Sequence, residues 1–114
     1  MPSDDAIHKT VQRTRLAELR SRYSWHLDHG EWREWAELCT TDAEVNYGSI
    51  DSLVGREEIF EFGREVVAEM YSYSMHTAQV PRFDIDGDET VGQWYLLVFY
   101  EMPDGTAGHV GGTY

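Results

Sequence analysis

The sequence has only one cysteine, Cys39, and no long apolar run among its 114 residues. A single cysteine excludes an internal disulfide and a thiolate cluster for a metal ion. A run of about 18 apolar residues would be needed for a transmembrane helix, so none is predicted. Residues 1–14 lack the apolar segment of a signal peptide, and we therefore expect a cytoplasmic protein.

Basic residues are also scarce, because 9 lysines and arginines stand against 21 acidic residues, for a net charge of -12. This balance argues against nucleic acid or an anionic membrane as the main partner. Hydrophobic residues make up 41% of the chain and aromatic residues 13%, which is typical of a globular protein. A chain of this length buries roughly two-thirds of its unfolded surface, enough for one core, so residues 1–114 are predicted to form a single domain.

The first half of the chain predicts two consecutive helices. Between Asp5 and His29, apolar or aromatic residues recur at spacings of three to five, as in an amphipathic helix: Ile7, Val11, Leu16, Leu19, Tyr23 and Leu27. Ser3 or Asp4 is suited to cap its start, and Gly30 its end. A shorter helix follows over Glu31–Cys39, with one face formed by Trp32, Trp35, Ala36 and Cys39.

The second half of the chain changes from a helical period to alternation typical of strands. The predicted elements are a strand over 43–48, a helix over 56–71, strands over about 75–85 and 91–102, and a last strand after 103–105. The order α-α-β-α-β-β-β indicates an α+β domain with helices gathered on one face of an antiparallel sheet. The segment 84–88, DIDGD, resembles part of a calcium loop but lacks the later glutamate, so it is predicted to be a turn.

The run from Gln93 to Tyr100 is apolar or aromatic on both faces of its predicted strand. A strand with one solvated face would alternate with polar residues, so both faces are expected to be covered. Helices can cover one face. We expect a second subunit to cover the other, in a homo-oligomer that is a dimer or a trimer.

The segment RYSWHLDHG places Asp28 at the end of the first helix, where the helix dipole disfavours a carboxylate by up to about 1 kcal/mol. A compensating partner is therefore expected, and His76 at the start of the third predicted strand is the candidate. If Asp28 accepts the Nδ1 proton of His76, Nε2 is left free as a base. Tyr23 and Tyr47 can supply phenol donors to a carbonyl or leaving oxygen.

Each of these residues also has a plain structural interpretation. His76 alone is typical of a hydrogen-bonded core histidine, Asp28 of a solvated acid, and the tyrosines of simple packing. Tyr23 and Asp28 are five residues apart, or about 140° around an ideal helix, so they share a cavity only if it is wide or the helix end unwinds.

A metal site is the rival chemistry for the same segment. His26 and His29 are three residues apart and could reach one ion together with Asp28 or Glu31. No carboxylate cluster completes this set, so no metal is predicted. The remaining histidines, His8 and His109, have no pattern around them and are predicted to lie on the surface.

Several short motifs together resemble a known family. They are Tyr-x4-Asp at Tyr23 and Asp28, Gly-x-Trp at Gly30 and Trp32, Asn-Tyr at Tyr47, Met-His at Met75 and His76, and Gly-x-Trp-Tyr at Gly92, Trp94 and Tyr95. Over residues 7–114 the sequence resembles SnoaL-like members of the nuclear transport factor 2-like superfamily, nearest the scytalone dehydratase and bile acid 7α-dehydratase branches.

The resemblance implies a cone-shaped curved sheet around a long helix, with a deep apolar pocket. It implies an Asp28 and His76 base pair, tyrosines Tyr23 and Tyr47 that bind oxygen, no cofactor, and frequent trimers. Tyr100 stands where scytalone dehydratase has a second histidine, which argues against the scytalone reaction itself. Relatives continue past the equivalent of residue 114 with at least one more strand, so an uncovered sheet edge is expected here.

The predicted function is a cofactor-free dehydratase-type lyase or isomerase that acts on a ring or polyketide-like carbonyl compound. The predicted substrate-binding residues are apolar side chains that would exclude water: Trp25, Phe62, Val66, Met70, Leu97 and Phe99. Two alternatives stay open. One is a non-catalytic protein that binds an apolar or carbonyl-containing ligand, and the other is an assembly module that uses its open sheet as an interface.

Overall fold

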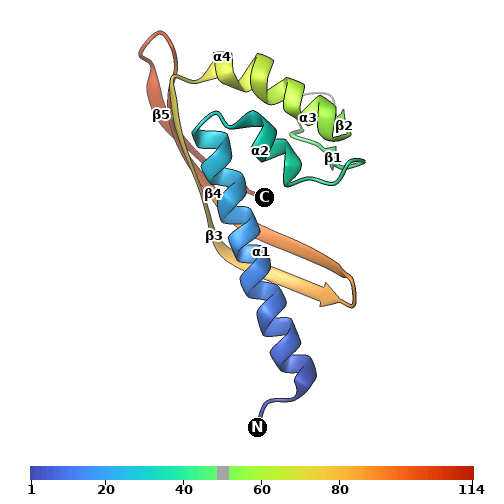
Figure 1. Cartoon of the computed structure of the whole chain (residues 1–114). Coiled ribbons are helices and arrows are strands. Elements are labelled where there is room, and N and C mark those ends of the chain that lie inside the picture. Colours follow the sequence, from blue (N-terminus) through green and yellow to red (C-terminus); the bar gives the residue numbers. More distant parts are fainter. Residues whose placement is uncertain (49–51) are drawn as a thin grey trace.

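The computed structural model describes residues 1–48 and 52–114 and begins with the predicted pair of helices (Figure 1). Helix α1 spans Asp4–Asp28 and helix α2 spans Trp32–Glu37. The Ser3 hydroxyl caps α1 by accepting a hydrogen bond from the Ala6 backbone N–H at 3.1 Å. Gly30 has a φ of 68°, a left-handed conformation that lets the chain turn sharply between the two helices.

The helix expected over 56–71 is present but is divided by a wider turn. Helix α3 spans Arg56–Phe62, a π-helical turn η1 spans Gly63–Val67, and helix α4 spans Ala68–Met70. Gly63 at the start of the π turn is buried against the rings of Trp32 and Trp35. A uniform hydrophobic stripe in the sequence does not reveal such a turn, because the apolar positions still fall on one side.

The strands form two antiparallel sheets. Strands β3 (Tyr73–Asp86), β4 (Glu89–Glu101) and β5 (Ala107–Thr113) form a sheet in the order β3-β4-β5. Strands β1 (Glu44–Val45) and β2 (Leu53–Val54) form a separate pair. The observed layers confirm the predicted α+β fold class.

The first strand is shorter than predicted, and β2 was not predicted at all. The strand expected over 43–48 ends at Val45, because the Asn46 side chain accepts a hydrogen bond from the Gly48 backbone N–H at 2.8 Å and turns the chain. Residues 49–51 lie outside the described residues. The segment 84–88 is a hairpin turn, as expected: Asp86 pairs with Glu89, and Gly87 has a φ of 58°.

Helix α1 lies along the sheet and contacts β3, while α2 and the α3 to α4 segment pack around its C-terminal half (Figure 1). The N-terminal half of α1 projects away from these helices, and the molecule is elongated, measuring 57 × 28 × 23 Å. The buried core lies among the helices and consists of Leu27, Trp35, Ala36 and Ile59. This core fixes the C-terminal end of α1, the end that carries Asp28. No helix among the described residues is long and apolar enough to cross a membrane.

The two faces of the large sheet differ in exposure. His76 pairs opposite Val98, which is 5% exposed, so this face is the one that packs toward α1. The other face carries apolar side chains that are exposed in the described part of the chain: Val91, Tyr95 and Phe99. Residues 1–48 and 52–114 thus cover one face of the sheet, and the expected self-association stays a prediction.

Gly63→Ala is expected to destabilise the protein. An added Cβ would lie 2.8 Å from Trp32 Cε3 and 2.9 Å from Trp35 Cζ3, and Trp35 is fully buried. Overpacking of this kind costs about 1 to 3 kcal/mol. Urea denaturation measures the loss. Gly112→Ala is the matched control, because nothing lies within 4 Å of its Cβ. Equal stability of the two variants would contradict the close packing at Gly63.

The uncovered sheet face predicts that the chain associates with copies of itself. Tyr95, which is 62% exposed at the centre of this face, is the residue to change. We expect Tyr95→Glu to shift the protein toward a monomer, because a charge in an apolar interface loses its hydration. Light scattering at micromolar concentration measures the mass, and Val54→Glu, on the small hairpin, is the control. A wild-type protein that is already monomeric would refute this prediction.

Candidate active site

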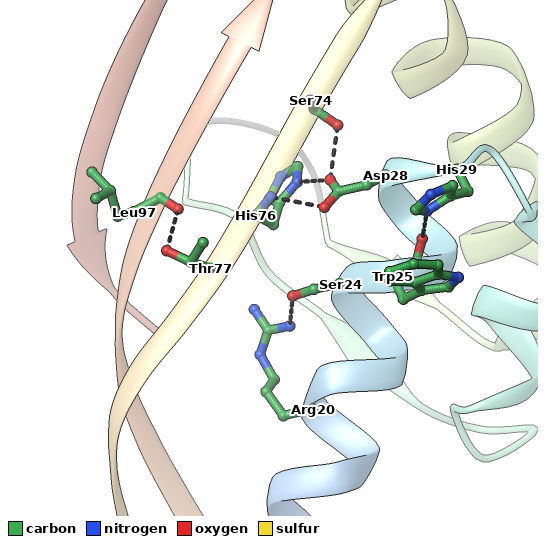
Figure 2. A network of polar contacts seen from close by, with 9 residues as sticks. All are labelled: Arg20, Ser24, Trp25, Asp28, His29, Ser74, His76, Thr77 and Leu97. Carbon is green, nitrogen blue, oxygen red and sulfur yellow. Dashed lines mark hydrogen bonds and ion pairs between the residues drawn. The ribbon is translucent and has the colours of Figure 1, made fainter.

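Asp28 accepts three hydrogen bonds from β3 at the C-terminal end of α1 (Figure 2). Its Oδ1 lies 2.9 Å from the Ser74 hydroxyl and 2.6 Å from His76 Nδ1, and its Oδ2 lies 2.9 Å from the His76 backbone N. Hydrogen bonds to a carboxylate are stronger than neutral ones, and together they offset the unfavourable helix dipole. The predicted compensation of Asp28 therefore includes a serine and a backbone N–H in addition to the histidine.

The contact with Asp28 determines which nitrogen of His76 is free. An ionised carboxylate can only accept a hydrogen bond, so Nδ1 carries the proton and Nε2 keeps its lone pair. Within residues 1–48 and 52–114, Nε2 has no hydrogen-bond partner. The side chains of His76 and Asp28 are 15% and 12% exposed, so the pair is shielded yet reachable. This arrangement can accept a proton from a bound molecule.

A cleft of about 650 Å³ lies beside this pair, between α1 and β3. Its size suits a small molecule. Asp28, Ser74 and His76 line it together with residues of α1, notably Arg20, Ser24 and Trp25. Trp25 is 63% exposed, and its ring stacks on that of His29 with centroids 4.2 Å apart.

The two predicted tyrosines contact each other and do not line this cleft. The hydroxyls of Tyr23 and Tyr47 are 3.0 Å apart, the Tyr23 ring packs against Trp35, and the Tyr47 ring stacks on Phe62. Loss of hydration raises the pKa of Tyr23 well above its ordinary value, and the Tyr47 and Tyr114 hydroxyls add to this effect. Loss of hydration also raises the pKa of Tyr47, against the opposing effect of its hydrogen bond to Tyr23. The four candidate residues thus form two pairs.

Of the six apolar residues predicted to bind substrate, the structure places only Trp25 on the cleft. Leu97 and Phe99 alternate with Val98, so they point to the sheet face opposite His76. Val66 and Met70 are 42% and 38% exposed on the segment that follows α3, and Phe62 packs on Tyr47. The apolar character of the run on β4 could not reveal which half of it faces α1.

The potential metal ligands near Asp28 are directed to separate partners. His26 Nδ1 lies 3.1 Å from Glu31 Oε1, and His29 Nδ1 lies 2.7 Å from the Trp25 backbone oxygen. Asp28 is occupied by His76 and Ser74. In the described part of the chain, no three His, Cys, Asp or Glu side chains converge as they would around an ion.

Comparison with known protein families identifies the family of this chain. A family model described as the SnoaL-like domain matches residues 9–114. The chain belongs to the SnoaL-like family. A comparison with curated protein sequences finds no match.

Solved structures share this fold at low sequence identity. A putative scytalone dehydratase from Novosphingobium aromaticivorans DSM 12444 is 20% identical, with a TM-score of 0.84 over 93% of this chain and 72% of that one. LinA is 17% identical, with a TM-score of 0.87 over 94% and 74%. A variant of Rv3472 from Mycobacterium tuberculosis, a protein of unknown function, is 18% identical, with a TM-score of 0.82 over 94% and 62%.

Sequence reasoning missed three polar residues that line this cleft: Arg20, Ser24 and Ser74. Ser74 precedes His76 by two residues, a spacing that places both side chains on one face of a strand. Ser24 and Arg20 precede Asp28 by four and eight residues, a spacing that places all three on one face of a helix. Both spacings are visible in the sequence, but only a known partner for Asp28 makes them informative.

The raised pKa of Tyr23 and of Tyr47 predicts a late alkaline titration. Because the folded state holds both phenols protonated, their contribution to stability is complete below about pH 10 and is lost as the pH rises through the raised values. Phenolate absorbance followed against pH measures this. Tyr23→Phe should remove part of the absorbance increase that occurs at high pH. Tyr95→Phe, which changes a 62% exposed ring, should leave that increase intact. A single early transition of all tyrosines would contradict the raised pKa values of Tyr23 and Tyr47.

Proposed function

We propose that this SnoaL-like protein is a dehydratase-type lyase that acts on a small carbonyl compound without a cofactor. The observation that carries the proposal is the 2.6 Å contact between Asp28 and His76 Nδ1, which leaves Nε2 unpaired beside a cleft. A base needs a lone pair, a fixed orientation and access to substrate, and this geometry supports all three.

In the proposed reaction, His76 Nε2 removes a proton from the carbon next to the carbonyl group. The electrons of that C–H bond form a carbon–carbon double bond while the bond to a hydroxyl on the next carbon breaks. The imidazolium then returns its proton to the departing hydroxyl, which leaves as water. Asp28 stabilises the imidazolium in between, and general acid–base catalysis of this kind contributes about 10² to 10⁴-fold.

We propose Tyr23 and Tyr47 as phenol donors only toward a distant oxygen of the substrate. Their raised pKa values keep them protonated, as a donor requires. Such a substrate would have to extend past Arg20, which lines the cleft and lies over the Tyr23 ring. The proton transfer itself is assigned to His76 and Asp28.

The names of structural neighbours favour a lyase over other proton-transfer enzymes. Besides the putative scytalone dehydratase, a hexachlorocyclohexane dehydrochlorinase (LinA) type 2 shares the fold with a TM-score of 0.81. It is 19% identical and is matched over 95% of this chain and 77% of its own. Both names denote an elimination, the reaction class that a lone base beside a cleft can perform.

His76→Ala is expected to lower turnover by at least about 10²-fold, because the base is lost. Asp28→Asn should also lower it, because an amide next to Nδ1 allows the wrong tautomer. The assay follows the absorbance of conjugated products formed from a panel of β-hydroxy ketones and β-hydroxy acids. Circular dichroism verifies folding, and His109→Ala is the control, since this exposed histidine lies on β5.

Unchanged rates in His76→Ala would end the catalytic proposal. A wild-type protein that binds members of the panel but converts none of them would favour the alternative of a non-catalytic binding protein.

A further inference from the structure

Arg20 is a buried cation near the proposed base. Its residue is 7% exposed, and its Nη1 donates to the Ser24 hydroxyl at 2.8 Å. Its Nε is enclosed and has no acceptor. Within residues 1–48 and 52–114, no carboxylate forms an ion pair with Arg20. A buried charge without a counter-charge is energetically costly, because it has lost its hydration.

Aromatic rings compensate for only part of this cost. The guanidinium carbon of Arg20 lies 4.6 Å from the ring centroid of Tyr23 and 4.4 Å from that of Tyr114. Cation–π contacts stabilise a charge, but a ring face offers no strong hydrogen-bond acceptor for the N–H groups. The pocket around Arg20 therefore holds the cation in a fixed place and leaves its donors without an anion.

The position of Arg20 relates it to His76. Both residues line the same cleft, and in the close-up the Arg20 side chain extends along α1 toward the strand that carries His76 (Figure 2). Its hydrogen-bond partner Ser24 stands one helical turn before Asp28, or about 6 Å along the helix axis. A small molecule in the cleft can therefore reach the guanidinium and the imidazole at the same time.

We infer that Arg20 binds an anionic group of the substrate, and that the substrate class is carbonyl compounds that bear a carboxylate. A guanidinium is planar and matches a carboxylate, which accepts charge-assisted hydrogen bonds. The carboxylate would lie roughly one helical turn from the carbon that loses its proton. The place of that carbon rests on the proposed function, whereas the anion site rests on Arg20 alone.

The net charge of the chain does not favour the binding of anions. At -12 overall, the protein repels anions in general, so a preference for an anionic ligand has to come from a local cation. Arg20 is a buried cation that lines this cleft. Arg22, two residues away on the same helix, is exposed and already pairs with Glu18 at 3.2 Å.

Two ligands of nearly the same shape test the inference without any turnover. The probes are 2-naphthoate and 2-naphthamide, which differ in charge, and their dissociation constants are measured by NMR titration of the backbone amides. We expect naphthoate to bind the wild-type protein at least about 10-fold more tightly than naphthamide. Arg20→Met should abolish the preference. Arg22→Met removes the same charge from the same helix and should preserve it.

Further variants keep the outcome decisive. If Arg20→Met does not fold, Arg20→Lys replaces it, and a smaller but measurable naphthoate preference is expected, because an ammonium lacks the planar donor edge. Absence of the preference in the wild-type protein, or its persistence in Arg20→Met, would show that Arg20 is structural only and would overturn the inference.

His76→Ala separates this inference from the proposed function. The variant should keep the naphthoate preference while losing turnover. If His76→Ala instead keeps its turnover, the proposed function fails and the anion site stands. If the wild type shows no preference for naphthoate while His76→Ala still abolishes turnover, the anion site fails and the proposed function stands.

Discussion

The acceptance of three hydrogen bonds by Asp28 joins the helical layer of this protein to its sheet. The apolar core lies among the helices, so this polar contact is where the end of α1 is attached to β3. The same contact offsets the helix dipole and selects the tautomer of His76. Without its partners Asp28 would be an unpaired and largely shielded carboxylate at a helix C-terminus, which is energetically costly.

The face of α1 that carries this contact is unusual for a helix packed on a sheet. Arg20, Ser24 and Asp28 follow one another at intervals of four residues, and all three line the cleft. An ordinary amphipathic helix would present apolar side chains there. Buried polar residues that break the local pattern are expected where a protein binds or reacts, and here they flank one cavity.

Much of the fold was predictable because its signals are local. The two first helices, the glycine between them and the hairpin at Gly87 follow from spacing and turn chemistry. Other predictions failed because the sequence pattern did not carry the deciding contact. The β1 strand ends early because Asn46 bonds to Gly48, and the face of β4 toward α1 depends on the register that pairs His76 with Val98.

The sequence by itself determined the two first helices, the helix that begins at Arg56 and the three long strands, and it indicated Asp28 and His76 as candidate partners. Only the tertiary structure decided that Ser74 would donate a third hydrogen bond to Asp28 and that Tyr23 would contact Tyr47. It also decided that Arg20 would be buried beside the cleft. The physical reason is that helix and strand periods specify faces along one element, whereas contacts between elements depend on packing that no single segment encodes.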